Sequence, residues 1–426
     1  MVKRDRNHPS IIMWSIGNEV GERTGVSDGY AWCQKQAETV RSLDSTRFVT
    51  SALPFLFEEM LPEIAANPEN IWDIGNRIPT DPEKDRWGMV TRDFFAPLDV
   101  GGYNYLNNRY EFDAKQFAER IVCGTETWPH QAYATWDSTR RLANVIGDFV
   151  WTSIDYLGES GIGKVTIDGP EGLFFMGDAW PYHLANCGDI DICGFKRPQS
   201  YYRDILWEVR SEPFIAVLPP QYYGKKIVFN PWGWEPVIAS WDFPGADGMK
   251  TQVDVYSDSD EVELRVNGAS AGRKPAGAAQ KNKASFEVLY TPGTIEAVAY
   301  SAGKETGRFA LQTPAAPKAL RLTTDRNTLK AVYGDLAYVT VEIVDPNGAV
   351  VKHAGDEVSF EVSGVGDILA VGTANPVSEE LYIGSKRCAF EGRLLVVLRS
   401  SGEAGEICLK AAAEGLEGTE IHLSVK

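Results

Sequence analysis

Residues 10–20 read Ser-Ile-Ile-Met-Trp-Ser-Ile-Gly-Asn-Glu-Val, and they decide how the first part of the chain folds. The apolar run Ile11–Ile16 stops abruptly at Gly17 and is followed by Asn18 and Glu19. A continuous apolar run of this length, bounded by a proline and a glycine, predicts a strand buried on both faces of a parallel sheet. Barrel enzymes place catalytic groups at the carboxyl ends of such strands, so Glu19 is a candidate acid or base.

The first half of the chain, residues 1–212, alternates strand-like and helix-like stretches. Further strands are predicted over 47–53, 98–105, 120–125 and 148–154, and amphipathic helices over 30–43 and 110–119. Strand, helix and strand in alternation predict βα units on a parallel sheet.

The second half has a different pattern of short alternating strands and turns. These strands are predicted over 253–256, 262–266, 284–289, 294–300, 338–344 and 358–362. Asn267-Gly268 is a hairpin signal, residues 345–348 form a turn, and residues 313–317 are typical of a linker. We therefore expect two β-sandwiches, over 213–312 and 313–426. Trp232 and Trp234 are expected in the core or at domain contacts.

Composition restricts the possible partners. The 426 residues are enough for roughly two to four domains. A formal charge of −17 argues against nucleic acid, whose phosphates need concentrated Lys and Arg. No apolar run approaches the roughly 18 residues of a membrane span, so no membrane partner is expected. The N-terminus lacks the apolar core of a signal peptide, which leaves a cytoplasmic or a periplasmic location in a bacterium open.

The six cysteines are scattered through the chain, and none has a Cys-x-x-Cys spacing. Without this spacing no metal site is predicted. Cys187 and Cys193 could form a disulfide, but six free thiols in a reducing compartment are the favoured interpretation. No motif calls for a cofactor, and none is expected.

A second carboxylate, Glu126, follows the strand-like residues 121–125. Two opposed carboxylates at the top of a barrel are what glycoside hydrolysis requires, one to protonate the departing oxygen and one to attack the anomeric carbon or activate water. Tyr105 and Trp151 follow neighbouring strands and would supply a hydroxyl for the nucleophile and a platform for the sugar. A Glu after a buried strand is also a common solvated loop residue, so this pattern alone leaves both interpretations open.

Residues 4–19, Arg-Asp-Arg-Asn-His-Pro-Ser-Ile-Ile-Met-Trp-Ser-Ile-Gly-Asn-Glu, resemble the acid/base signature of glycoside hydrolase family 2. This family includes β-galactosidases, β-glucuronidases and β-mannosidases. The resemblance implies that Glu19 is the general acid/base and that Asn18 binds the sugar 2-hydroxyl. Glu126, in Gly-Thr-Glu-Thr-Trp, matches the position of the nucleophile.

The same resemblance implies further substrate-binding residues. Asn104 and Tyr105 end the segment 99–105, where the family keeps a tyrosine beside the nucleophile. Trp151 matches the tryptophan of the last barrel strand that faces the sugar. Trp128 and His130 closely follow the nucleophile and are candidate substrate contacts, although a loop histidine is as often simply solvated.

The resemblance also implies an architecture: a partial (β/α)8 TIM barrel of strands 4–8 over residues 1–212, followed by two immunoglobulin-like β-sandwiches. The N-terminal domains and first three barrel strands of the family have no counterpart in this sequence. We therefore expect little or no activity from the isolated chain, and a partner that is either the missing N-terminal half or a second copy of the chain.

The implied function is that of a retaining exo-β-glycosidase acting on a β-galactoside or oligosaccharide. The sequence contains no Asn-x-Lys motif of the kind that binds a uronate carboxylate, which favours a galactosidase. β-Glucuronidase or β-mannosidase specificity remains an alternative, as does a non-catalytic carbohydrate-binding fragment.

Overall fold

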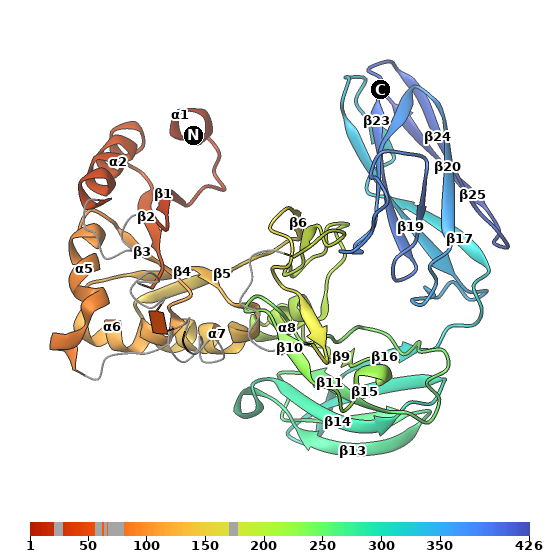
Figure 1. The fold of residues 1–426 in the computed structure, drawn as a ribbon, viewed down its shortest axis with the longest axis horizontal. Coiled ribbons are helices and arrows are strands. Elements are labelled where there is room, and N and C mark those ends of the chain that lie inside the picture. The colour runs from red at the N-terminus through yellow and green to blue at the C-terminus, as the bar shows by residue number, and fades with distance from the viewer. Residues whose placement is uncertain (21–28, 56–61, 64–65, 67–80, 170–177) are drawn as a thin grey trace. The chain divides into compact units, whose positions relative to one another are not determined.

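A computed structural model of the protein describes residues 1–20, 29–55, 62–63, 66, 81–169 and 178–426 (Figure 1). The chain divides into two compact units. The first comprises Met1–Ser153, Asp168–Phe174 and Val228–Trp234, and the second comprises Ile154–Ile167, Phe175–Ile227 and Glu235–Lys426. The predicted domain limits at 212 and 312 remain predictions.

The first unit is built on a five-stranded sheet whose strands lie in chain order, β1-β2-β3-β4-β5. Each neighbouring pair is parallel. The strands are β1 (Met13–Asn18), β2 (Phe48–Leu53), β3 (Val100–Asn104), β4 (Val122–Thr127) and β5 (Val145–Val150). The helices are α1 (Val2–Asp5), α2 (Gly29–Leu43), α5 (Arg86–Phe95), α6 (Tyr110–Gln116) and α7 (Ala132–Arg141), with 3-10 turns η3 (Pro82–Lys84), η4 (Asn107–Arg109) and η5 (Pro129–Gln131). The predicted alternation of strands and helices is confirmed, whereas numbering the strands 4–8 of a barrel remains a prediction.

The centre of this sheet is strand β3, in which all five residues are buried. Its sequence, Val-Gly-Gly-Tyr-Asn, lets the neighbouring strands approach closely. A Cβ atom at Gly102 would lie 2.6 Å from the Ser51 carbonyl oxygen and 2.9 Å from Cγ2 of Thr125. Only glycine therefore fits between β2 and β4 at this point.

Aromatic side chains pack the helices α5 and α6 against the sheet. Their core consists of Trp87, Phe94, Phe95, Tyr103 and Tyr110 with aliphatic neighbours. A buried ion network closes this layer: Arg109 lies 2.7 Å from Asp85 and 2.9 Å from Asp113. Tyr103 donates a hydrogen bond of 2.6 Å to Asp113. Each charge of this network has an opposite partner, which offsets part of the cost of its burial.

The second unit contains a first β-sandwich, with sheets β14-β11-β9 and β13-β12-β15-β16. Its strands are β9 (Phe214–Val217), β11 (Lys250–Tyr256), β12 (Glu261–Val266), β13 (Ala269–Pro275), β14 (Lys283–Leu289), β15 (Thr294–Ser301) and β16 (Lys304–Gln312), with the 3-10 turn η7 (Ala278–Gln280). Trp241 is fully buried in the core between them. Asn267 and Gly268 have φ angles of 49° and 81°, which the two-residue hairpin turn between β12 and β13 requires. The hairpin prediction is confirmed.

A second sandwich follows, with sheets β17-β19-β23-β21 and β18-β25-β24-β20-β22. Its strands are β17 (Ala319–Thr324), β18 (Thr328–Leu329), β19 (Leu336–Val344), β20 (Glu357–Gly364), β21 (Gly366–Gly372), β22 (Lys386–Cys388), β23 (Arg393–Ser400), β24 (Gly405–Ala413) and β25 (Thr419–Val425). The predicted turn at 345–348 is present, because the Asp345 carboxylate accepts bonds of 2.8 Å and 2.9 Å from the amides of Asn347 and Ala349.

The remaining described elements lie outside these sheets. They are β6 (Tyr156–Leu157), β7 (Val165–Ile167), β8 (Leu184–Ala185), α8 (Pro198–Leu206), η6 (Pro220–Tyr222) and β10 (Ile227–Phe229). Asp155, just before β6, is buried and pairs with Arg197 at 2.5 Å.

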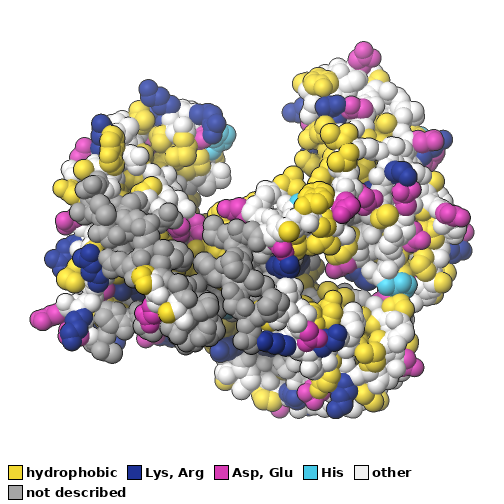
Figure 2. Space-filling model, in the orientation of Figure 1, with side chains coloured by type: hydrophobic (Ala, Val, Ile, Leu, Met, Phe, Trp, Pro, Cys, Tyr) yellow, Lys and Arg dark blue, Asp and Glu magenta, His cyan; other side chains and the backbone are white. Residues whose placement is uncertain are grey.

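The described surface carries charges of both signs and exposed apolar side chains. On the face drawn in Figure 2, Lys and Arg side chains are interspersed with Asp and Glu. Among the described helices, none combines the length and the apolar character needed to cross a bilayer.

Replacing Gly102 with alanine is expected to destabilise the first unit by about 1–3 kcal/mol. The added methyl group would clash with the backbone carbonyl of Ser51, which cannot move without disturbing the pairing of β2 with β3. Urea unfolding followed by tryptophan fluorescence reports on this unit, since nine of the twelve tryptophans lie within Met1–Ser153 and Val228–Trp234.

Gly17→Ala is the matched control in the same sheet. Its new Cβ would first meet Oγ of Ser51 at 3.0 Å, and that side chain can rotate away. An equal loss of stability in both variants would contradict the close backbone approach at Gly102.

Candidate active site

The predicted site residues lie at the carboxyl ends of neighbouring strands. Glu19 follows β1, Tyr105 follows β3 and Trp151 follows β5, while Glu126 is the fifth residue of β4. Their main chains are joined by hydrogen bonds: Tyr105 donates to the Glu126 carbonyl at 2.7 Å, and Trp151 donates to the Thr127 carbonyl at 3.0 Å. Because the strands are parallel, all four residues reach the same edge of the sheet.

The Asn104 side chain links residues at the ends of strands β1 and β4. Its Nδ2 donates to Oε1 of Glu19 at 3.0 Å and to Oδ1 of Asn18 at 3.0 Å. Its Oδ1 accepts from the Thr125 hydroxyl at 2.7 Å, and the residue has no exposed surface. The amide predicted to contact substrate therefore also orients the candidate acid/base, and Thr125 fixes which way the amide points.

Tyr105 holds the candidate nucleophile. Its hydroxyl donates to Oε2 of Glu126 at 2.7 Å and accepts from Nε1 of Trp232 at 2.9 Å. The Trp128 ring stacks on the Tyr105 ring at a centroid distance of 3.8 Å and an angle of 29°. Burial and the nearby Glu126 carboxylate raise the pKa of Tyr105, so the phenol stays protonated and remains a donor.

Glu126 is itself strongly perturbed. Burial is the main cause that raises its pKa from 4.5 to about 7, and the charge of Glu19 adds to this effect. The hydrogen bond from Tyr105 acts in the opposite direction and stabilises the carboxylate. A carboxyl group this perturbed makes the edge of the sheet a candidate functional site.

Two of the site residues also carry unusual backbone conformations. Glu19 has a φ of 50° and Tyr105 a φ of 58°, both in the left-handed region that side chains other than glycine seldom adopt. These residues occupy equivalent places, directly after β1 and β3. Such strain collects at functional sites, where the surrounding contacts must maintain it.

The other predicted contacts have distinct environments. Trp128 is 5% exposed, and the Tyr105 ring covers one of its faces. His130 is exposed, and its ring lies 6.4 Å from that of Trp128 at an angle of 21°. Trp151 is half-buried. Trp128 therefore packs mainly on Tyr105. Trp151 and His130 keep exposed surface that a ligand could contact.

Trp232 is a site residue that the sequence did not reveal. Its pattern predicted a core or domain contact, yet it belongs to the segment Val228–Trp234 of the first unit. It is 6% exposed, and its ring packs against that of Trp128 at 4.9 Å and 65°. No local motif marks it, because it lies far along the chain from the residues that it contacts.

Three family models match the chain. Residues 1–84 match the glycosyl hydrolases family 2 TIM barrel domain, and residues 320–422 match the glycoside hydrolase family 2 C-terminal domain 5. Residues 248–307 match a domain of unknown function.

Similar proteins cover the whole chain. A β-galactosidase from Bacteroides ovatus is 28% identical over 100% of this chain and 50% of its own length. A candidate β-glucuronidase from Formosa agariphila is 25% identical over 97% of this chain and 38% of its own length. A solved structure of a glycosyl hydrolase family 2 member from Bacteroides cellulosilyticus is 36% identical, with a TM-score of 0.84, over 100% of this chain and 51% of that one. The chain thus spans half, or less, of the length of these curated relatives.

A TIM-barrel segment with strand-end carboxylates, joined to β-sandwiches, defines a glycoside hydrolase architecture. The chain belongs to glycoside hydrolase family 2.

Replacing Glu126 with glutamine is expected to stabilise the protein above neutral pH. The folded pKa of about 7 exceeds the ordinary value of 4.5, so the folded state binds more protons than the unfolded state between these pH values. Wild-type stability therefore falls as pH rises from 4.5 to about 7. The uncharged glutamine avoids this loss, which we expect to be about 2 kcal/mol after allowing for residual solvation.

The measurement is the free energy of unfolding in urea at pH 4 and pH 8. Glu126→Gln should exceed wild type clearly at pH 8 and only slightly at pH 4, where the carboxyl group is protonated in both states. Glu119→Gln, at an exposed position in the same unit, should show no such pH dependence. An equal difference at both pH values would refute the raised pKa of Glu126.

Proposed function

We propose that the chain carries the catalytic pair of a retaining exo-β-glycosidase, most readily a β-galactosidase. The observation that carries this proposal is the pairing of Glu126 with the Tyr105 hydroxyl at 2.7 Å, beside Glu19 held by Asn104 at 3.0 Å. Each carboxylate thus has a buried hydrogen-bonding partner. The role of nucleophile requires Glu126 to be ionised, although burial raises its pKa.

In the proposed first step, Glu126 attacks the anomeric carbon while Glu19 donates its proton to the departing glycosidic oxygen. This breaks the bond to the leaving group and forms a covalent glycosyl ester on Glu126. Glu19, now ionised, removes a proton from water, and the resulting hydroxide displaces Glu126 from the anomeric carbon. Tyr105 favours the ionised nucleophile before attack, because its hydrogen bond opposes the effect of burial on the Glu126 pKa.

Asn18 and Trp151 complete the proposal as substrate contacts. The Asn18 amide shares Nδ2 of Asn104 with Glu19, so it lies beside the proposed acid/base, where a sugar 2-hydroxyl would bind. The name of the Bacteroides ovatus relative supports a β-galactoside as substrate. β-Glucuronidase is the second candidate, supported by the name of the Formosa agariphila relative.

Incubation with 2-deoxy-2-fluoro-β-galactosyl fluoride tests the pair without requiring fast turnover. The fluorine at carbon 2 slows release of the covalent ester, and fluoride needs no protonation to leave. We expect intact-protein mass spectrometry to show one added sugar, located by peptide mapping on Glu126. The label should be lost in Glu126→Gln and retained in Glu19→Gln, which lacks only the acid/base.

Glu119→Gln is the matched control for an exposed carboxylate, and it should label like wild type. Glucuronyl and mannosyl fluorides, tested in parallel, decide among the specificities. Labelling at another residue, or no labelling by any of the three sugars, would overturn the proposed enzyme. Glycan binding without labelling would instead identify a carbohydrate-binding module.

A further inference from the structure

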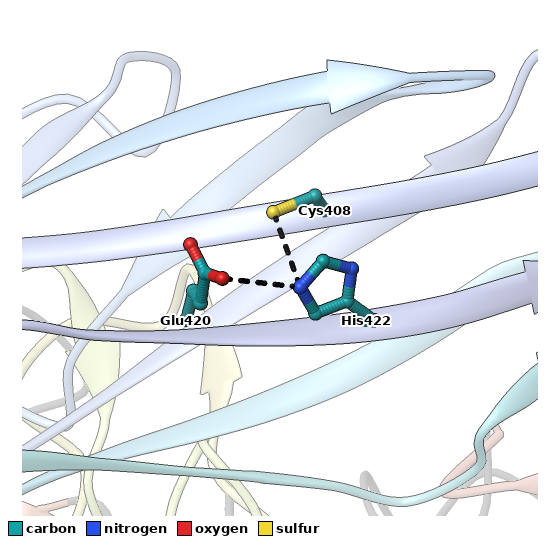
Figure 3. A group of neighbouring side chains, drawn as sticks. All are labelled: Cys408, Glu420 and His422. Carbon is teal, nitrogen blue, oxygen red and sulfur yellow. Dashed lines mark hydrogen bonds and ion pairs between the residues drawn. The ribbon is translucent and has the colours of Figure 1, made fainter.

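Within the described part of the chain, three side chains of metal-binding type gather on the last sandwich, far in sequence from the candidate active site. They are Cys408, Glu420 and His422, and their ligand atoms all lie within 4.8 Å of one another (Figure 3). Cysteine spacing predicted no metal site, because sequence motifs record ligands that are close along the chain. Here the ligands come from two antiparallel strands.

The strand register brings these residues together. Strands β24 and β25 pair so that Cys408 lies opposite His422 and Lys410 lies opposite Glu420. Since side chains alternate between the two faces of a sheet, Glu406, Cys408 and Lys410 share one face with Glu420 and His422. The backbone ladder therefore fixes the group, and no flexible loop has to be ordered to form it.

The orientation of His422 is that of a metal ligand. Its Nδ1 lies 3.0 Å from Oε1 of Glu406, and its Nε2 points the other way, 3.2 Å from Oε1 of Glu420 and 3.9 Å from Sγ of Cys408. A carboxylate on one ring nitrogen and the metal on the other is the usual arrangement of a metal-bound histidine. Glu406 would thus orient the ring and select the tautomer.

The distances from Nε2 of His422 are close to those between ligands of a tetrahedral zinc ion. Bonds of about 2.3 Å to sulfur and about 2.1 Å to nitrogen require roughly 3.6 Å between the two ligand atoms. The observed 3.9 Å between Sγ and Nε2 needs only a small rotation of either side chain. The site is also accessible, since the side chains of His422 and Glu420 are 48% and 50% exposed.

We propose that Cys408, Glu420 and His422 bind a zinc ion, with water in the fourth position and Glu406 as the positioning partner of His422. A thiolate, an imidazole and a carboxylate form a mixed ligand set that suits Zn²⁺ better than Mg²⁺ or Ca²⁺, which prefer oxygen ligands. Binding releases the thiol proton to solvent and joins β24 to β25 through side chains as well as through the backbone.

The positive charge of Lys410 disfavours binding of the zinc ion. Lys410 Nζ lies 3.6 Å from Oε2 of Glu420 and competes for this carboxylate. The register places Glu361 of the neighbouring strand β20 opposite Lys410 on its other side. Removal of Lys410 should therefore strengthen metal binding rather than weaken it.

The test is a titration of the whole chain with Co²⁺ in oxygen-free buffer, followed by competition with Zn²⁺. Cobalt bound to a thiolate gives a charge-transfer band in the near ultraviolet. We expect this band in wild type, its displacement by stoichiometric zinc, and its loss in Cys408→Ser. Cys388→Ser is the matched control, since Cys388 is likewise an exposed free thiol of this sandwich and should leave the band unchanged.

Two further variants separate a built site from adventitious binding. Glu406→Gln should keep the band but weaken zinc affinity by about 10–100-fold, as expected for a partner that only orients a ligand. Lys410→Gln should raise the affinity. Retention of the band in Cys408→Ser, or equal zinc affinity in wild type, Glu406→Gln and Lys410→Gln, would overturn the site. These readouts do not depend on glycosidase activity.

Discussion

The close approach of β2, β3 and β4 at Gly102 is the constraint on which the candidate site depends. With no side chain at this position, β3 can lie deep between its neighbours, and all of its residues are buried. Of the two residues that hold the carboxylates, Asn104 ends this buried strand and Tyr105 comes directly after it. The positions of these side chains are therefore set by the backbone packing of the sheet rather than by loops.

The electrostatics of the site follow from the same burial. Burial raises the pKa of Glu126 to about 7. The hydrogen bond from Tyr105 stabilises the carboxylate and so lowers this pKa. Trp128 and Trp232 in turn hold Tyr105 by stacking and by a hydrogen bond. A group this perturbed weakens the fold above neutral pH, so the burial of Glu126 does not serve stability there.

The sequence predicted these strands and turns because their signals are local. The run Ile11–Ile16, which ends at Gly17, and the hairpin Asn267-Gly268 each carry their own structural requirement within a few residues. The contact of Trp232 with Tyr105 and the hydrogen bond from Asn104 to Glu19 join residues far apart in the sequence. They depend on which strands become neighbours, and this information is not present in any single stretch of sequence.

The cluster of Cys408, Glu420 and His422 on the last sandwich also depends on which strands are neighbours. Cys408 and His422 are unremarkable residues of two alternating strands, and their meeting depends only on the antiparallel register of β24 with β25. A shift of β25 by one residue would turn Glu420 and His422 to the other face of the sheet, away from Cys408. The hydrophobic core of the sandwich, with Ile407, Leu409 and Leu423 on the inner face, excludes this shift. The same burial that stabilises the domain therefore holds the thiol, the imidazole and the carboxylate together on its outer face.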